Sequence, residues 1–140
     1  EIDEVVRLLK KISKSVHPFD LRVSGVGAFP QLTDARVLWF GVQNKKYLGQ
    51  LKDELDARLE SKLRGYREQR EFSPHLTIGR LKNSQSVYDM VSPFVRKDFG
   101  KLGVESLVLF ESHRHGAQTV YNPIFEVKLE GQPELALEFA

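Results

Sequence analysis

Cysteine is absent from this 140-residue sequence, and its absence excludes several kinds of chemistry. Without a thiol, the chain forms no disulfide bond, binds no zinc ion through thiolates and has no cysteine nucleophile. A sequence without cysteine also fits a reducing compartment, so we expect a cytoplasmic protein.

The sequence also lacks a long apolar run and a large excess of charge. Its apolar stretches, such as residues 37–40 and 107–110, are far shorter than the roughly 20 residues of a membrane-spanning helix, so we expect no membrane association. A formal net charge of +2 is too small to identify a nucleic-acid-binding protein by itself. The 41% of hydrophobic residues suits one globular domain with a sizeable core.

The order of helical and strand patterns predicts an α+β fold with largely antiparallel pairing. Apolar residues at helical spacing predict one helix at the start of the chain and a second over residues 48–63. A third helical pattern covers residues 83–100, where Pro93 would cost about 3 kcal/mol inside a regular helix and therefore predicts a kink or a restart. The strand patterns cover residues 19–29, 36–42, 72–82, 104–112 and 119–129.

Two of these strand patterns carry turn or bulge signals. Residues 30–35 contain a proline, a threonine and an aspartate, and this turn chemistry predicts a hairpin between the first two strands. Pro123 lacks the N–H that a central strand would donate, so we expect it at a sheet edge or at a bulge.

Residues 72–82, with the sequence FSPHLTIGRLK, place a histidine two positions before a threonine on a predicted strand. Successive side chains of a strand alternate between two faces, so His75 and Thr77 share one face at a separation of about 6.6 Å. Leu76 and Ile78 share the other face, which we expect to point inward. On its own, the position of His75 fits a catalytic histidine and a structural one equally well. The structural alternative is a half-buried histidine bonded to Thr77 or to the backbone.

The position of Arg80 depends on the glycine before it. In a regular strand, Arg80 would lie on the face opposite to His75 and Thr77. A β-bulge at Gly79 would reverse this, because one extra residue re-aims the side chains that follow it. Arg80 therefore joins the polar pair only if the strand is kinked.

The other three histidines give weaker signals. His17 precedes Pro18 at a helix end, where we expect it to cap the helix or to lie exposed. His113 and His115 alternate as strand metal ligands do, but we identify no carboxylate or third histidine at ligand spacing. A solvated loop beside Gly116 is the favoured interpretation.

The whole phrase around His75 resembles the H-x-T-x signature of the two-histidine (2H) phosphoesterases. Specifically, it is similar to the archaeal and bacterial RNA 2′,3′-cyclic phosphodiesterases, also described as 2′-5′ RNA ligase-like proteins. The resemblance extends through residues 17–30, 36–42 and 98–100, and it covers nearly the whole chain except about the last ten residues. It implies a two-lobed α+β fold around a central cleft, in which each lobe supplies one H-x-T strand.

The resemblance also implies roles for individual residues. His75 corresponds to the base that activates water, Thr77 and Arg80 to groups that bind the phosphate, and Tyr121 to an aromatic that lines the cleft. The implied activity is hydrolysis of RNA 2′,3′-cyclic phosphate ends to a phosphomonoester, expected to be a 2′-phosphate. The resemblance also allows a reversible 2′-5′ RNA ligase activity. Two histidines suffice as acid and base, so no metal or cofactor is expected, and the implied partner is RNA or a related nucleotide.

The sequence departs from the family at one point, because it contains no second H-x-T. In the family, the first motif lies just before a helix that resembles residues 1–12. We therefore expect residues 1–140 to form a single domain that lacks its N-terminal strand, with an unassigned tail over residues 130–140. The alternatives are a non-catalytic RNA-binding or nucleotide-binding module that keeps one half of the site, or a scaffold that binds a protein partner.

Basic and aromatic side chains gather between residues 62 and 72. They are possible RNA contacts, since cations and stacking rings are what single-stranded RNA requires. A solvated helix end is the alternative, because Glu68 and Glu71 offset part of the charge. The side chains are Lys62, Arg64, Arg67 and Arg70, with Tyr66 and Phe72.

Overall fold

The structure is a computed structural model that describes residues 1–43, 45–66 and 71–132. The described residues divide into two compact units. Unit 1 contains residues 1–19, 53–66 and 104–132, and unit 2 contains residues 20–43, 45–52 and 71–103. Within the described residues, no helix is long and apolar enough to span a bilayer.

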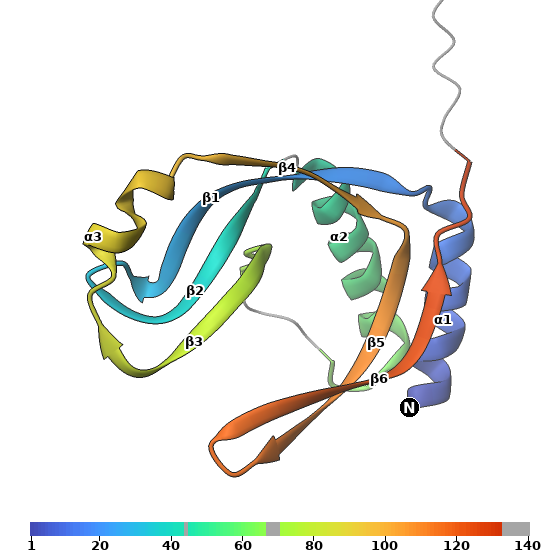
Figure 1. Cartoon of the computed structure of the whole chain (residues 1–140). Coiled ribbons are helices and arrows are strands. Elements are labelled where there is room, and N and C mark those ends of the chain that lie inside the picture. The colour runs from blue at the N-terminus through green and yellow to red at the C-terminus, as the bar shows by residue number, and fades with distance from the viewer. Residues whose placement is uncertain (44, 67–70, 133–140) are drawn as a thin grey trace, which may run out of the picture. The chain divides into compact units, whose positions relative to one another are not determined.

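Unit 1 begins with helix α1 (Ile2–Ser15), which confirms the first predicted helix. Leu8, Leu9 and Ile12 are buried on one side of the helix, as their spacing predicts. Acidic residues in the first turn and a lysine in the last turn interact favourably with the helix dipole. The buried side packs against strands β5 (Ser106–His115) and β6 (Gln118–Lys128), beside which α1 lies in Figure 1.

Strands β5 and β6 form a two-stranded antiparallel sheet. Phe110 pairs with Pro123 and Leu109 pairs with Phe125, so Ile124 is an extra residue on β6. The bulge lies directly after Pro123, which confirms the predicted bulge position for this residue.

The segment after β6 returns to the end of α1. The backbone N–H of Glu130 donates to the Ser13 carbonyl at 2.8 Å, and that of Gly131 donates to the Val16 carbonyl at 3.0 Å. A Cβ at Gly131 would lie 2.7 Å from the Ser15 carbonyl carbon, so the approach requires glycine. The start of the unassigned tail is thus held by α1, whereas residues 133–140 lie outside the described residues.

Unit 2 contains a four-stranded sheet with the strand order β3-β2-β1-β4. Strand β1 (Phe19–Gln31) and strand β2 (Asp34–Gln43) pair as an antiparallel hairpin in which Gln31 faces Asp34 across a two-residue turn. This confirms the predicted hairpin. Strand β3 (His75–Gln85) pairs antiparallel with β2 (Figure 1).

One face of this sheet forms the core of unit 2. Helix α3 (Tyr88–Val91) and the 3₁₀ helix η1 (Ser92–Phe94) follow β3, and the core joins α3 to the β1–β2 hairpin. Because β1 and β2 alternate, their remaining side chains point to the opposite face. The buried residues of the core are Val26, Ala28, Ala35, Val87 and Val91.

The third predicted helix is wrong over most of residues 83–100. Strand β3 continues to Gln85, α3 has 4 residues, and strand β4 (Asp98–Val104) begins where the helix was expected to continue. The restart at Pro93 is confirmed as η1, which carries the proline in its first turn. Strand β4 pairs with β1, which is distant in sequence, and a local apolar period does not reveal such a pairing.

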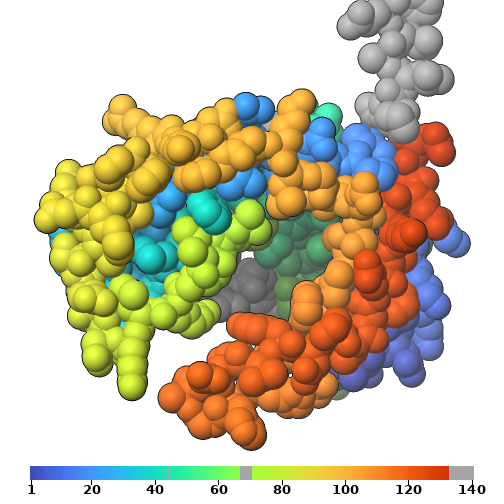
Figure 2. Space-filling view, viewed as in Figure 1, coloured from blue at the N-terminus to red at the C-terminus, as the bar shows by residue number. Residues whose placement is uncertain are grey.

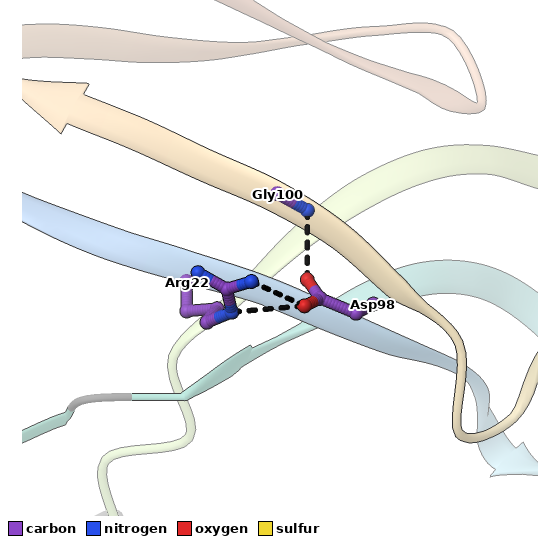
Figure 3. A network of polar contacts seen from close by, with 3 residues as sticks. All are labelled: Arg22, Asp98 and Gly100. Carbon is purple, nitrogen blue, oxygen red and sulfur yellow. Dashed lines mark hydrogen bonds and ion pairs between the residues drawn. The ribbon is translucent and has the colours of Figure 1, made fainter.

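A polar cluster joins β1 to β4 (Figure 3). Arg22 Nε donates to Asp98 Oδ2 at 3.0 Å, and the N–H of Gly100 donates to Asp98 Oδ1 at 2.9 Å. A backbone bond from the Gly25 N–H to the Lys97 carbonyl, at 2.7 Å, adds to this link.

Helix α2 (Lys45–Lys62) confirms the second predicted helix. Of its leucines, Leu51 is buried and the others are half-buried. Gly65, with a φ of +84°, follows the helix end as predicted. The division between the two units falls within α2, between Lys52 and Asp53.

Candidate active site

Strand β3 brings the three predicted site residues of unit 2 to one face of the sheet. His75, Thr77 and Arg80 each pair with a residue of β2, and directly paired residues share a face. Those partners are every second residue of β2, so they also share a face with one another. They are Gly41, Trp39 and Val37, respectively.

A β-bulge makes this arrangement possible. Thr77 pairs with Trp39 and Gly79 pairs with Leu38, so Ile78 is an extra residue on β3. The extra residue reverses the alternation and turns Arg80 to the face of Thr77. The kink on which the prediction for Arg80 depended is therefore present, but its extra residue is Ile78 and not Gly79.

Leu76 and Ile78 were predicted to point inward; Leu76 does lie on the core-facing side of the sheet, but neither side chain is buried. Ile78 is 47% exposed, because as the extra residue of the bulge it lies outside the regular alternation. Leu76 pairs with the core-facing Phe40 but is 37% exposed, because β3 is an edge strand. In Figure 2, atoms of β3, in yellow-green, lie at the surface on the viewed side of the molecule.

The backbone before β3 orients the imidazole of His75. Its Nδ1 atom lies 2.7 Å from the carbonyl oxygen of Ser73. A carbonyl only accepts hydrogen bonds, so Nδ1 donates, and the neutral ring carries its lone pair on Nε2. His75 is exposed, which contradicts the half-buried structural alternative even though the ring does bond to the backbone.

Two aromatic rings of the hairpin flank this imidazole. The ring centroids of Phe29 and His75 are 5.1 Å apart with an interplanar angle of 86°, an edge-to-face contact. The Trp39 centroid lies 6.4 Å from that of His75 and 5.4 Å from that of Phe29. We name Phe29 and Trp39 the aromatic wall. Sequence analysis missed it because the contact depends on the register of three strands.

Tyr121 lies on β6 of unit 1, whereas His75, Thr77 and Arg80 lie in unit 2. It is 58% exposed. The pairing of β5 with β6 puts Phe110 and Arg114 on the same face of the hairpin as Tyr121.

The remaining histidines differ in part from expectation. His17 is half-buried, and its Nδ1 lies 2.7 Å from the Pro18 carbonyl oxygen. His113 and His115 lie on β5 and not in a loop, and Glu111 Oε2 is 3.3 Å from His113 Nε2, so a carboxylate does accompany them. Within the described ranges, no group of three or more side chains could hold a metal ion.

The basic stretch before the motif is described only in part. Lys62 and Arg64 are exposed at the end of α2. Their exposure fits both interpretations of this stretch, as RNA contacts and as a solvated helix end. The Tyr66 hydroxyl donates to Asp56 Oδ1 at 3.0 Å, and the Lys52 ammonium lies 5.7 Å from the centre of the Phe72 ring. Arg67 and Arg70 lie outside the described residues.

The fold is that of a known group of solved structures. A crystal structure of a Thermus thermophilus protein matches with a TM-score of 0.75 at 23% identity, covering 95% of this chain and 72% of that one. A structure of E. coli LigT complexed with 3′-AMP matches with a TM-score of 0.65 at 20% identity, covering 91% of this chain and 68% of LigT. These likenesses show that the chain has the α+β fold of these two structures.

Sequence comparison is more specific. The profile of the 2′-5′ RNA ligase superfamily matches residues 1–116, so the chain belongs to that family. The RNA 2′,3′-cyclic phosphodiesterase of Methanocaldococcus jannaschii is 30% identical over 131 residues, which are 91% of this chain and 72% of the relative. Proteins of the same name from Aquifex aeolicus and Archaeoglobus fulgidus are each 32% identical, and the chain spans 70% and 62% of their lengths.

Proposed function

We propose that the protein carrying this chain hydrolyses RNA 2′,3′-cyclic phosphate ends to 2′-phosphates, with His75 as the general base. The observation that carries the proposal is the bulged register of β3, which gives His75, Thr77 and Arg80 a common face. The names of the three relatives, each an RNA 2′,3′-cyclic phosphodiesterase, support the same substrate class.

In the proposed reaction, Nε2 of His75 accepts a proton from water while the water oxygen bonds to phosphorus. The bond between phosphorus and the ribose O3′ breaks, and an acid gives O3′ a proton. The products are a 2′-phosphate and a 3′-hydroxyl, so atoms and charge balance. Each such acid or base typically contributes about 10²–10⁴ in rate. The resemblance assigns the acid to a first H-x-T motif, which the printed sequence does not contain.

The other site residues have binding roles in this proposal. The Thr77 hydroxyl and the Arg80 guanidinium hold the phosphate oxygens and offset the negative charge that develops on them. Tyr121 stacks against a base, a role that suits an exposed ring with Phe110 and Arg114 on its face of the hairpin. With a 5′-hydroxyl in place of water as the nucleophile, the same site would form a 2′-5′ phosphodiester and release the 3′-hydroxyl, as a reversible 2′-5′ ligase.

The test uses the full-length protein that carries this chain. It is incubated in EDTA with an oligonucleotide that ends in a 2′,3′-cyclic phosphate, and mass spectrometry and ³¹P NMR identify the product. We expect a 2′-phosphate, and we expect His75→Ala to lower kcat by about 10²–10⁴. His115→Ala, an exposed strand histidine of unit 1, is the matched control.

The outcome also separates this proposal from the alternative of a non-catalytic binding module. The alternative rests on the single H-x-T of the sequence. Binding of 3′-AMP or the oligonucleotide without turnover, in the full-length protein, would favour that module. Full activity in His75→Ala would rule out the catalytic role of this histidine.

A further inference from the structure

We propose that Phe29 and Trp39 are positioning residues for His75, and that Gly27 admits Trp39 to its place. This inference rests on the proposed function, since it explains how the base is held. The two rings of the aromatic wall and the imidazole form one cluster, with centroid separations between 5.1 and 6.4 Å.

The register of the hairpin builds the wall on the side of the sheet that faces away from the core. Gly27 pairs with Trp39, and Phe29 pairs with Val37, while the core-facing Ala28 pairs with Leu38. Trp39 also pairs with Thr77 on its other side. The indole therefore lies on the same face of the sheet as His75. It projects from β2, which lies between β3 and β1.

Gly27 is needed because the indole lies across β1. A Cβ at position 27 would overlap the indole atoms Cζ2 and Cη2 of Trp39. Any side chain there would push the ring away from the strand. The glycine that weakens β1 as a strand thus provides the space that the wall requires.

Packing, and not a hydrogen bond, holds the indole in place. The Nε1 atom of Trp39 is buried, and among the described residues it has no hydrogen-bond partner. A buried donor without an acceptor is unfavourable, so a ring in this place has to be retained by its contacts. These contacts include those with Gly27 and Phe29.

The wall and the Ser73 carbonyl together restrict the imidazole. The carbonyl holds Nδ1 at 2.7 Å, while the edge-to-face contact with Phe29 fixes the plane of the ring. With both restraints present, Nε2 keeps one direction and the neutral ring keeps one tautomer. Without the wall, the ring turns about its side-chain bonds and the Ser73 hydrogen bond weakens.

Two measurements test this inference. In the 140-residue chain, long-range ¹H–¹⁵N NMR at about pH 9 reports which nitrogen of the neutral His75 imidazole carries the proton. We expect the Nδ1–H tautomer in the wild type and a mixture in Phe29→Ala, Trp39→Ala and Gly27→Ala. In the full-length protein we expect the same variants to lower kcat about 10- to 100-fold with KM changed by less than about twofold, because a misplaced base affects the reaction more than binding.

Controls separate positioning from stability. Trp39→Phe keeps a ring and removes the unpaired donor, so it should retain the tautomer and most of kcat. Tyr88→Ala, an exposed aromatic of α3, should change neither measurement. If an alanine variant does not fold, Phe29→Leu and Trp39→Leu keep apolar volume while removing the ring, and they decide the question.

Folded Phe29→Leu and Trp39→Leu variants with the wild-type tautomer and the wild-type kcat would show that the wall does not position His75. Failure of the proposed function looks different: the wild-type protein would show no hydrolysis, while the tautomer would still change with the wall.

Discussion

The surroundings of Asp98 lower the pKa of its carboxyl group. Its hydrogen bond from Arg22 is the main cause, and the N–H of Gly100 contributes, so its pKa is lowered below the usual 3.8. A carboxyl with a lowered folded-state pKa stabilises the protein above its unfolded pKa. That stability is lost as the pH falls through the folded-state pKa.

We therefore expect Asp98→Asn to destabilise the chain at neutral pH, with a difference that fades in acid. Urea unfolding of both proteins from pH 7 downward measures this. The difference should be constant well above pH 3.8 and vanish once the folded-state pKa has been passed. Both side chains of the pair are partly exposed, so added salt should also reduce the difference.

Asp89→Asn, which changes an exposed acid of α3, is the control. An Asp98→Asn difference that grows as the pH falls would contradict the direction of the pKa shift.

At the same scale, the sequence predicts part of the site. Alternation alone puts His75 and Thr77 on one face, whereas the place of Arg80 depended on a bulge that the sequence allowed but did not decide. The aromatic wall is not predictable in this way, because Phe29 and Trp39 meet His75 only after two strand pairings have been fixed. The prediction that Ile78 points inward was wrong. Its apolar side chain suggested a place in the core, but the bulge leaves it exposed.

Among the elements, those with a strong local pattern were predictable. Helix α1 has its apolar residues on one side, and the β1–β2 hairpin has turn residues at its tip. Strand β4 was not predictable, because apolar residues near Pro93 match a helical period while the partner of β4 lies far back in the chain on β1.

Gly25 is the point at which β1 meets the segment before β4. Its φ is +81°, and a Cβ there would lie 2.7 Å from the carbonyl oxygen of Val95. A left-handed conformation costs a residue with a side chain roughly 1–2 kcal/mol, and the close contact adds to this. We therefore expect Gly25→Ala to lower the free energy of unfolding by about 2 kcal/mol or more, measured by urea denaturation.

Gly103→Ala on β4 is the matched control. Its Cβ would meet only Asp20 Oδ1, at an ordinary 3.8 Å, so we expect a change within about 0.5 kcal/mol. Equal stability of the two variants would show that the conformation of Gly25 is not required.

For the whole molecule, both units are built from segments that are separated in sequence. Unit 1 combines the start, the middle and the end of the chain, and unit 2 takes the two stretches between them. That the 140 residues act as one 2H phosphoesterase-like domain stays a prediction, as does the pairing of Tyr121 with the site on β3.

The near balance of charge in the chain bears on how it would bind RNA. With 21 basic and 19 acidic residues, little general attraction to a polyanion is expected, and binding should rest on the few groups that meet the terminal phosphate. For single strands, each neutralised phosphate contributes about −0.7 to the slope of log K against log salt concentration. One or two phosphate contacts predict a slope between about −0.7 and −1.4 for the full-length protein with a short 3′-phosphorylated oligonucleotide, measured by fluorescence anisotropy.

Arg80→Gln should make this slope shallower by about 0.7, whereas Arg7→Gln on the exposed surface of α1 should leave it unchanged. A slope steeper than about −4 would mean that RNA is held by an extended basic surface, and the terminal phosphate would then not be the main contact. A shallow slope that Arg80→Gln does not change would assign the phosphate to another cation and would contradict the proposed phosphate-binding role of Arg80.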